Sequence, residues 1–256
     1  MTAGGPAMLA AMIGRILAVA LLWLAAASTP APAQAQAETQ GRRAAVVVEL
    51  YTSQGCIQCP RANRLLGSFA REEGVLALTF PVGIWDYLGW NDTFARPEFA
   101  ERQRQYARTM RMRGRFTPQL VLNGSRQLSA ADWEDARLAL DQVRAAPQPL
   151  ARNDLAISRL PNGRARVTLN ANARGAGAEI LLIAYDPGPL AVIVYGGLNT
   201  NRTVLHYNLV RTVERLGVWD GRAVWFERGR CTPQCAVIIQ QPNGGAILGA
   251  AYTERR

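Results

Sequence analysis

Two cysteines spaced three residues apart, Cys56 and Cys59, are the side chains in this sequence best suited to chemistry. They follow a nearly continuous apolar run at residues 44–51 and precede a segment with apolar residues at helical spacing. Unpaired N–H groups and the dipole at the start of a helix stabilise the thiolate form of a cysteine, which is the nucleophile. We therefore expect Cys56 to attack a partner sulfur and Cys59, one turn further on, to resolve the mixed disulfide.

The same spacing has two other interpretations, a structural disulfide and half of a zinc-binding set. The position of the pair after the first strand of a β-α-β pattern favours redox chemistry. A second pair, Cys231 and Cys235, has Pro233 between its members, and we expect a local disulfide there. Exchange with the first pair and a metal site made by all four cysteines are the alternatives.

The elements around the first pair alternate between strand and helix. Strands are expected at residues 44–51, 75–82, 119–122 and 126–128, and helices at 56–73, 97–112 and from a Ser-x-x-Asp capping pattern at Ser129 to about residue 145. This order predicts an α/β domain at residues 44–146 with a mixed, partly parallel central sheet and helices on both faces.

Pro147 and Pro149 interrupt that pattern and mark a boundary. Beyond them the chain reads as successive short strands, including one at residues 203–214, separated by Pro-Asn-Gly and Asp-Pro-Gly turns. This spacing is typical of an all-β antiparallel sandwich or partial barrel. We therefore expect a β-rich second domain at residues 153–252.

In these motifs the first domain resembles the thioredoxin superfamily. The run 46–51 resembles that fold's first core strand, and residues 116–119 resemble its cis-proline loop. The resemblance implies that Pro118 is cis and that Thr117 aligns an incoming substrate, whereas an ordinary proline at a strand start is the alternative. Glu49 resembles the buried acid that accepts the proton of the second thiol; a structural acid bound to the backbone or to an arginine is the alternative.

A loop rich in aromatic and acidic residues follows the second strand. Trp85, Asp86 and Trp90, with Asn91 and Asp92, are placed to grip a peptide or cover the thiols, and tryptophan packing between the two domains is the alternative. His206 is the sole histidine, and its strand-like surroundings favour a packed core residue over a catalyst.

More narrowly, the mature chain is similar to the secreted bacterial family catalogued as domain of unknown function twelve twenty-three. The motifs that carry this resemblance are residues 48–56, 85–90, 117–119, 185–187 and 210–211. The resemblance implies a thioredoxin-like domain joined to a β-rich domain, and no established substrate. Where the family has a histidine before the Trp-Asp pair, this chain has Pro81, Gly83 and Ile84, which puts any activity that needs that histidine in doubt.

The first 37 residues have the pattern of a cleaved signal peptide, with Arg15, an apolar run at 16–27 and Ala-x-Ala sites. We expect a periplasmic or secreted bacterial protein with no membrane span after cleavage. The formal charge is +10, but all 29 basic residues are arginine, and the densest run, at residues 102–115, has no interleaved aromatic residue apart from Tyr106, so we expect no nucleic-acid partner.

Three hypotheses follow. The first is a thiol-disulfide oxidoreductase that acts on protein or peptide thiols and disulfides without a cofactor, and it requires a reachable Cys56. The second is a protein that binds Zn²⁺ or Cu⁺ through its cysteine pairs. The third is a non-enzymatic binding module that has kept a thioredoxin-like fold.

Overall fold

The apolar run before the cysteines forms strand β2 (Val46–Thr52), in which every residue is buried. The structure is a computed structural model that describes residues 39–151 and 153–253. β2 pairs in parallel with β3 (Val75–Pro81) and antiparallel with β4 (Gln119–Leu122), which confirms the predicted mixed sheet. A parallel pair needs a crossover connection, and helix α2 (Cys59–Phe69) provides it.

Helices cover both faces of these strands, as the sequence predicts. Residues of α2 and α4 (Trp133–Ala145) share one hydrophobic cluster with β2, β3 and β4. Residues of α3 (Pro97–Thr109) pack in a second cluster on the opposite face. The alternation of side chains along β2 separates the two clusters, because successive residues of a strand point to opposite faces.

The first turn of α4 begins later than its capping pattern predicts. The expected cap, Ser129, is the last residue of β5 (Arg126–Ser129). Asp132 caps the helix instead, because its Oδ1 accepts hydrogen bonds from the N–H groups of Glu134 and Asp135 at 2.8 and 3.1 Å.

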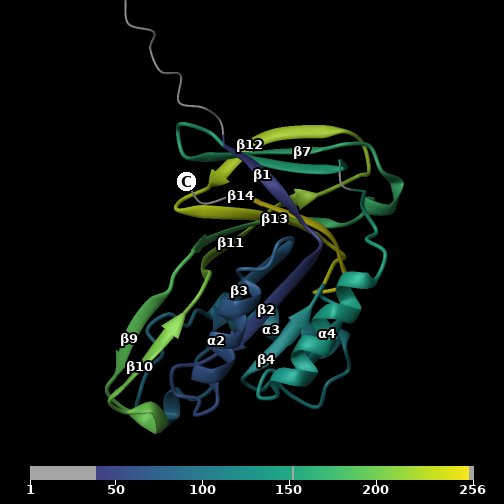
Figure 1. Ribbon diagram of the computed structural model, residues 1–256. Helices are drawn as coiled ribbons and strands as arrows, with labels where there is room; N and C mark the ends of the chain where they lie inside the picture. The colour runs from purple at the N-terminus through teal and green to yellow at the C-terminus, as the bar shows by residue number, and fades with distance from the viewer. Residues whose placement is uncertain (1–38, 152, 254–256) are drawn as a thin grey trace, which may run out of the picture. The chain divides into compact units, whose positions relative to one another are not determined.

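The strands from both parts of the chain join in one 12-stranded sheet of order β12-β7-β6-β1-β14-β13-β8-β11-β3-β2-β4-β5 (Figure 1). The remaining strands of this sheet are β1 (Thr39–Ala44), β6 (Leu155–Arg159), β7 (Arg164–Leu169), β8 (Glu179–Asp186), β11 (Leu209–Val218), β12 (Val224–Arg230), β13 (Gln234–Gln240) and β14 (Ile247–Thr253). The short helical turns are η1 (Asp86–Leu88), η2 (Ala173–Gly175) and η3 (Gly197–Asn199).

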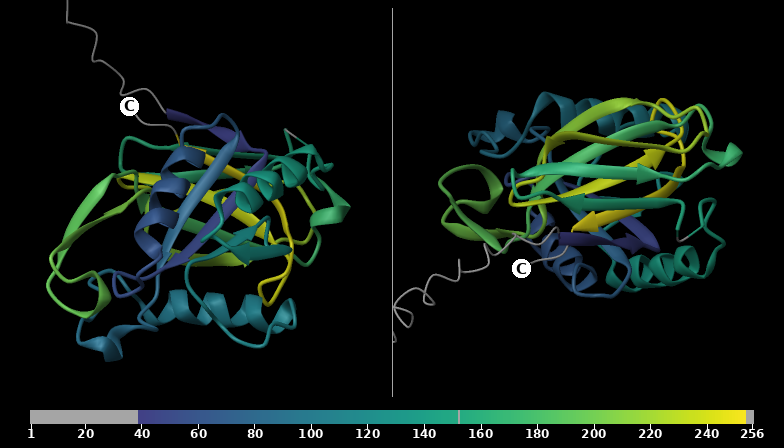
Figure 2. Two further views of the ribbon diagram at one scale, coloured as in Figure 1. Left: turned by 60° about the horizontal axis from the view of Figure 1, so that its bottom comes forward. Right: turned by 90° about the horizontal axis from the view of Figure 1, so that it is seen from above.

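The β-rich part is antiparallel and curls on itself, as the two views of Figure 2 show. Side chains of β6 and β7 share a third hydrophobic cluster with those of β8 and β13. β1 pairs with both β14 and β6, so the first described strand lies among strands of the second half. The described residues, 39–151 and 153–253, belong to one compact unit, and the division into domains at 44–146 and 153–252 stays a prediction.

One expected strand is divided in two. Residues 203–214 split at Tyr207 and Asn208 into β10 (Arg202–His206) and β11, and Asn208 has a φ of 45°, in the left-handed region. β10 pairs with β9 (Leu190–Val194) in a separate two-stranded sheet. We call residues 190–206, that is β9, η3 and β10, the arm; it extends from the main sheet beside α2 (Figure 1).

None of the α-helices within residues 39–253 has both the length and the apolar character that a bilayer crossing requires. The predicted signal peptide at residues 1–37 lies outside the described residues.

Candidate functional site

The first cysteine pair closes as a disulfide where β2 passes into α2. The Cα atoms of Cys56 and Cys59 are 5.3 Å apart, and Cys59 is the first residue of the helix. The N–H of Cys56 donates to the carbonyl of Ser53, and the N–H of Cys59 donates to the carbonyl of Cys56, both at 3.2 Å. These two turns bring the sulfurs together, and the predicted pairing is confirmed.

Both cysteines are buried. Cys56 exposes 2% of its surface and Cys59 none, whereas Ile57 between them exposes 48%. The expectation of a freely reachable Cys56 is therefore not met in this disulfide-bonded structure. We call residues 53–58 the cysteine loop. This loop is in contact with the loop 83–96 and with the tip of the arm, η3. The sequence pattern does not predict either contact.

Gln54 ties the cysteine loop to the loop 83–96. Its N–H donates to Asp92 Oδ2 at 2.7 Å, and its side-chain oxygen accepts from the Trp90 indole N–H at 2.8 Å. Its side-chain amide donates to Thr93 Oγ1 at 2.9 Å. Both backbone and side chain of Gln54 are thus fixed two residues before Cys56.

Asp92 is a buried carboxyl beside the cysteine loop. Burial raises its pKa to about 6, and the nearby charge of Asp86 adds to this rise, while hydrogen bonds from the N–H groups of Gln54, Phe94 and Ala95 act against it. The sequence places Asp92 in the loop 83–96, but it does not predict the contact of Asp92 with Gln54. Asp92 therefore has a pKa of about 6 and is bonded to Gln54, a residue two positions before Cys56.

Asn199, at the tip of the arm, holds the cysteine loop from the other side. Its side-chain amide donates to the carbonyls of Gln54 and Cys56, both at 2.8 Å. Its own Oδ1 is buried with no hydrogen-bond partner among the residues that the structure describes. Sequence reasoning missed this residue because 143 positions separate it from Cys56.

Trp85 connects the cysteine loop to the proline-bearing bend. Its indole N–H donates to Thr117 Oγ1 at 2.7 Å, and a Cβ placed on Gly55 would lie 2.9 Å from the Cβ of Trp85. The Thr117–Pro118 peptide bond is cis, as predicted. Trp85 therefore contacts both the cysteine loop, at Gly55, and the cis-proline bend, at Thr117, so the two predicted motifs lie at one site.

The other two loop residues that the sequence singles out also contact this site. Asp86 Oδ1 accepts from the N–H of Asp92 at 3.1 Å, and Trp90 bonds Gln54 as described. The Trp90 ring lies 6.0 Å from the ring of Tyr195 in the arm, and the Trp85 ring stacks on Tyr87 at 6.2 Å. That these side chains bind a substrate stays a prediction.

Glu49 has an arginine partner. Arg102 donates to Glu49 Oε1 from Nε at 3.1 Å and from Nη2 at 2.7 Å, and both side chains are buried. Val47 and Tyr51, which share its face of β2, pack in the cluster that includes α3, whereas Val48 packs in the cluster that includes α2. The carboxyl thus points to the face opposite the helix that carries Cys59. Transfer of the Cys59 proton by Glu49 stays a prediction.

The second pair, Cys231 and Cys235, closes as the predicted local disulfide in the cluster of the β-rich part. Thr253 Oγ1 accepts from the N–H of Cys235 at 3.1 Å and supports this turn. Within residues 39–151 and 153–253, no three His, Cys, Asp or Glu side chains group as a metal ion requires. Metal binding through the cysteines stays a prediction that metal analysis tests.

His206 is a packed core residue, as expected. It is fully buried at the end of β10, and its ring meets that of Phe94 edge to face at 5.4 Å. Neither ring nitrogen has a hydrogen-bond partner among the described residues. Burial, with a smaller contribution from the Arg211 charge, lowers its pKa to about 4.

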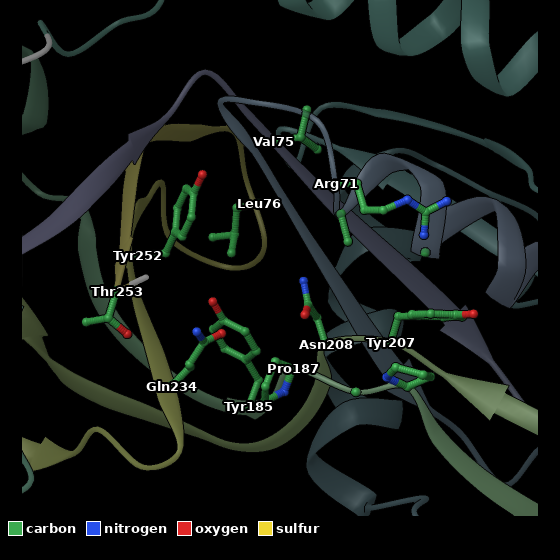
Figure 3. Close-up of a pocket in the computed structure, with 14 residues that line it drawn as sticks. Arg71, Val75, Leu76, Tyr185, Pro187, Tyr207, Asn208, Gln234, Tyr252 and Thr253 are labelled. Carbon is green, nitrogen blue, oxygen red and sulfur yellow. The ribbon is translucent and has the colours of Figure 1, made fainter. Parts of the chain in front are cut away.

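A cavity of about 510 Å³ is lined by the start of β3, the end of α2 and the segments that follow β8 and β10, and none of its lining residues is a cysteine (Figure 3). Tyr185, Tyr207, Tyr252 and Arg71 are among the side chains that line it. The cavity is thus separate from the disulfide site.

These features define a mixed α/β protein with a Cys-x-x-Cys disulfide at a strand-to-helix junction and a cis proline linked to it. The chain belongs to the family described as protein of unknown function (DUF1223), whose model matches residues 47–240. The resemblance drawn from the sequence is thereby confirmed.

Three relatives add detail. A probable thioredoxin of Archaeoglobus fulgidus is 46% identical over 37 residues, which are 14% of this chain and 41% of that protein. A protein of Agrobacterium tumefaciens with a known crystal structure is 28% identical in sequence. The two structures match with a TM-score of 0.68, over 82% of this chain and 94% of that one. HBP35 of Porphyromonas gingivalis is 13% identical, with a TM-score of 0.52, over 82% and 74% of the two chains, and this likeness shows the fold alone.

Proposed function

We propose that the protein is a thiol-disulfide oxidoreductase that acts through Cys56 and Cys59. The observation that carries the proposal is the closed Cys56–Cys59 disulfide at the start of α2, linked through Trp85 to the cis Thr117–Pro118 bond. The short similarity to a probable thioredoxin, over 37 residues, supports it. A thioredoxin-like domain at residues 44–146 is part of the proposal. The leader pattern at residues 1–37 favours action in the periplasm or outside a bacterial cell, where disulfides persist.

The reaction exchanges two electrons and two protons with a partner. In the reduced protein, the Cys56 thiolate attacks one sulfur of a partner disulfide, and the other partner sulfur leaves as a thiolate that takes up a proton. The Cys59 thiol loses its proton and attacks Cys56, so the second partner sulfur leaves and is protonated in turn. The protein ends as the disulfide and the partner as a dithiol; the reverse sequence oxidises a partner.

The test is exchange with a peptide substrate, followed by alkylation and mass spectrometry. We expect the reduced protein to convert a peptide disulfide to the dithiol while forming the Cys56–Cys59 bond. Cys56→Ser should abolish this turnover, and the matched control Cys231→Ala/Cys235→Ala should retain it. Turnover that is equal in Cys56→Ser and the natural protein would refute the proposal, as would stoichiometric metal on the four thiols.

A further inference from the structure

We infer that the arm is the element that recognises the substrate, and that its occupant is an extended, cysteine-bearing polypeptide with apolar side chains next to the cysteine. The inference rests on the proposed function and names its substrate class. It starts from the position of the arm: β9 and β10 belong to no strand pair of the main sheet, and their tip reaches the disulfide.

The arm is bonded to the cysteine loop at its tip and to α2 at its base. At the tip, Asn199 binds the carbonyl of Cys56, and a Cβ on Gly196 would lie 2.4 Å from the carbonyl oxygen of Gly89. At the base, the side-chain amide of Asn63 in α2 donates to the carbonyl of Leu205 at 2.8 Å. Because the backbones approach this closely, the tip lies directly against the loop 83–96 and the cysteine loop.

Around this contact, large apolar side chains remain exposed. Tyr195 exposes 68% and Tyr87 76% of their surfaces, and Ile193, Leu198 and Ile57 each expose about half. Apolar groups gathered beside a reactive site mark a surface for an apolar partner, because their burial removes that area from water. We call these five residues the collar.

Three of the five collar residues are linked to the cysteine loop. Tyr195 meets Trp90, which bonds the cysteine loop; Tyr87 stacks on Trp85, which contacts Gly55 and Thr117; Ile57 stands between the two cysteines. A chain that presents a sulfur to Cys56 therefore places its neighbouring side chains on the collar. A small dithiol has no such side chains.

Charge limits the occupant further. Arg61 in α2 and Arg202 in β10 are exposed, and neither forms an ion pair with any carboxylate of residues 39–151 and 153–253. Two unneutralised cations beside the site favour neutral or acidic segments over basic ones. The occupant is thus an apolar segment that is not positively charged.

Because Cys56 is buried, the arm also affects access to the disulfide. An attacking sulfur reaches Cys56 only after neighbouring residues move, and the arm tip, which lies outside the main sheet, is bonded to the Cys56 carbonyl. A polypeptide seated on Tyr195 and Leu198 contacts the segment that carries Asn199. Polypeptide binding and access to the disulfide are therefore linked through one element.

The test compares reduction of the disulfide-bonded protein by two dithiol peptides and by dithiothreitol. The peptides share length and net charge, and one has Leu and Phe beside its cysteines where the other has Ser and Asn. In each reaction the dithiol is oxidised as the Cys56–Cys59 bond is reduced. We expect the natural protein to react with the apolar peptide at least about fivefold faster than with the polar one.

Substitution of the arm supplies the second measurement. In Tyr195→Ser/Leu198→Ser, we expect the ratio of the apolar-peptide rate to the dithiothreitol rate to fall about tenfold, which corresponds to about 1.4 kcal/mol. The matched control Trp225→Ser replaces an equally exposed aromatic residue on β12 and should leave the ratio unchanged.

Each outcome separates the two claims. Reaction with dithiothreitol and peptides but no preference for the apolar peptide, or an unchanged ratio in the arm variant, overturns the inference and leaves the oxidoreductase intact. A change of oligomeric state in the arm variant, measured by sedimentation, overturns it in favour of a second copy as occupant. Failure of the natural protein to react with any dithiol overturns the proposed function itself, and the inference with it.

Discussion

Arg102 directs two N–H groups at one oxygen of the Glu49 carboxylate, at 3.1 and 2.7 Å. The same guanidinium donates to Tyr106 Oη and Gln240 Oε1, both at 2.9 Å, and all four side chains are buried. The pair joins β2 to α3 and, through Gln240, to β13 of the β-rich part. It is therefore a connection between the two halves of the main sheet.

Glu49→Gln is expected to lower the free energy of unfolding by about 3 kcal/mol, because it leaves the buried Arg102 charge without a counter-charge. Urea unfolding at pH 7 measures this loss. The double variant Glu49→Leu/Arg102→Met is the control and should cost less than Glu49→Gln, since it removes both charges. A loss below about 1 kcal/mol in Glu49→Gln, with a changed pH profile of thiol exchange, would instead favour the proton-transfer role.

His206 should make stability fall as the pH is lowered. Its folded-state pKa of about 4 lies below the ordinary value of 6.5, so between these values the unfolded chain binds more protons. Stability from this group is complete above pH 6.5 and falls by about 3 kcal/mol by pH 4. We expect His206→Phe to remove this slope in urea unfolding measured from pH 7 to 4. An identical slope in both proteins would contradict a buried, neutral His206.

Asp92 should make stability fall as the pH is raised, the opposite of the effect of His206. Its folded-state pKa of about 6 lies above the ordinary 3.8, so between these values the folded chain binds more protons. Its contribution to stability is complete below pH 3.8 and decreases by about 3 kcal/mol as the pH rises through 6. Asp92→Asn, which does not titrate, should therefore gain stability relative to the natural protein as the pH rises from 4 to 7. The difference between the two unfolding curves isolates this group from the other carboxyls.

The Cys231–Cys235 bond is expected to contribute stability and no catalysis. A closed loop of this length restricts the unfolded chain by about 2 kcal/mol. Cys231→Ala/Cys235→Ala should lower the unfolding free energy by that amount while peptide exchange at Cys56 continues. A parallel loss of exchange would show that the second pair passes electrons to the first.

The sequence predicts those elements whose residues interact locally. β4 has the expected bounds, the runs around residues 44–51 and 75–82 form β2 and β3, and Pro97 begins α3. Both disulfides follow from the short spacing of their cysteines, whereas the cis bond at Pro118 is implied by the resemblance to the thioredoxin superfamily. Local pattern is sufficient for the strands, the helix start and the disulfides because each of these features depends on neighbours a few positions away.

The rest depends on distant pairs that no local pattern encodes. The contact of Asn199 with Cys56 joins positions 143 apart, and the break between β10 and β11 depends on Asn208, whose side chain donates to the carbonyl of Ala77 at 2.8 Å. Likewise the partner of Glu49 comes from a helix 53 residues away. The burial of Cys56 follows from such contacts, which is why the sequence predicted an open thiol.

The hydrogen bond from Trp85 to Thr117 provides a last prediction, because it is the direct link between the loop 83–96 and the cis-proline bend. If this bond positions the bend for substrate, Trp85→Phe and Thr117→Val each remove it and should each lower kcat/KM for the apolar peptide by about fivefold, as for the loss of one hydrogen bond. Since both variants delete the same interaction, the double variant should be no slower than either single one. Thr117→Ser keeps the hydroxyl and should restore most of the rate. Losses that multiply in the double variant would show that the two side chains act separately, through packing rather than through their shared bond.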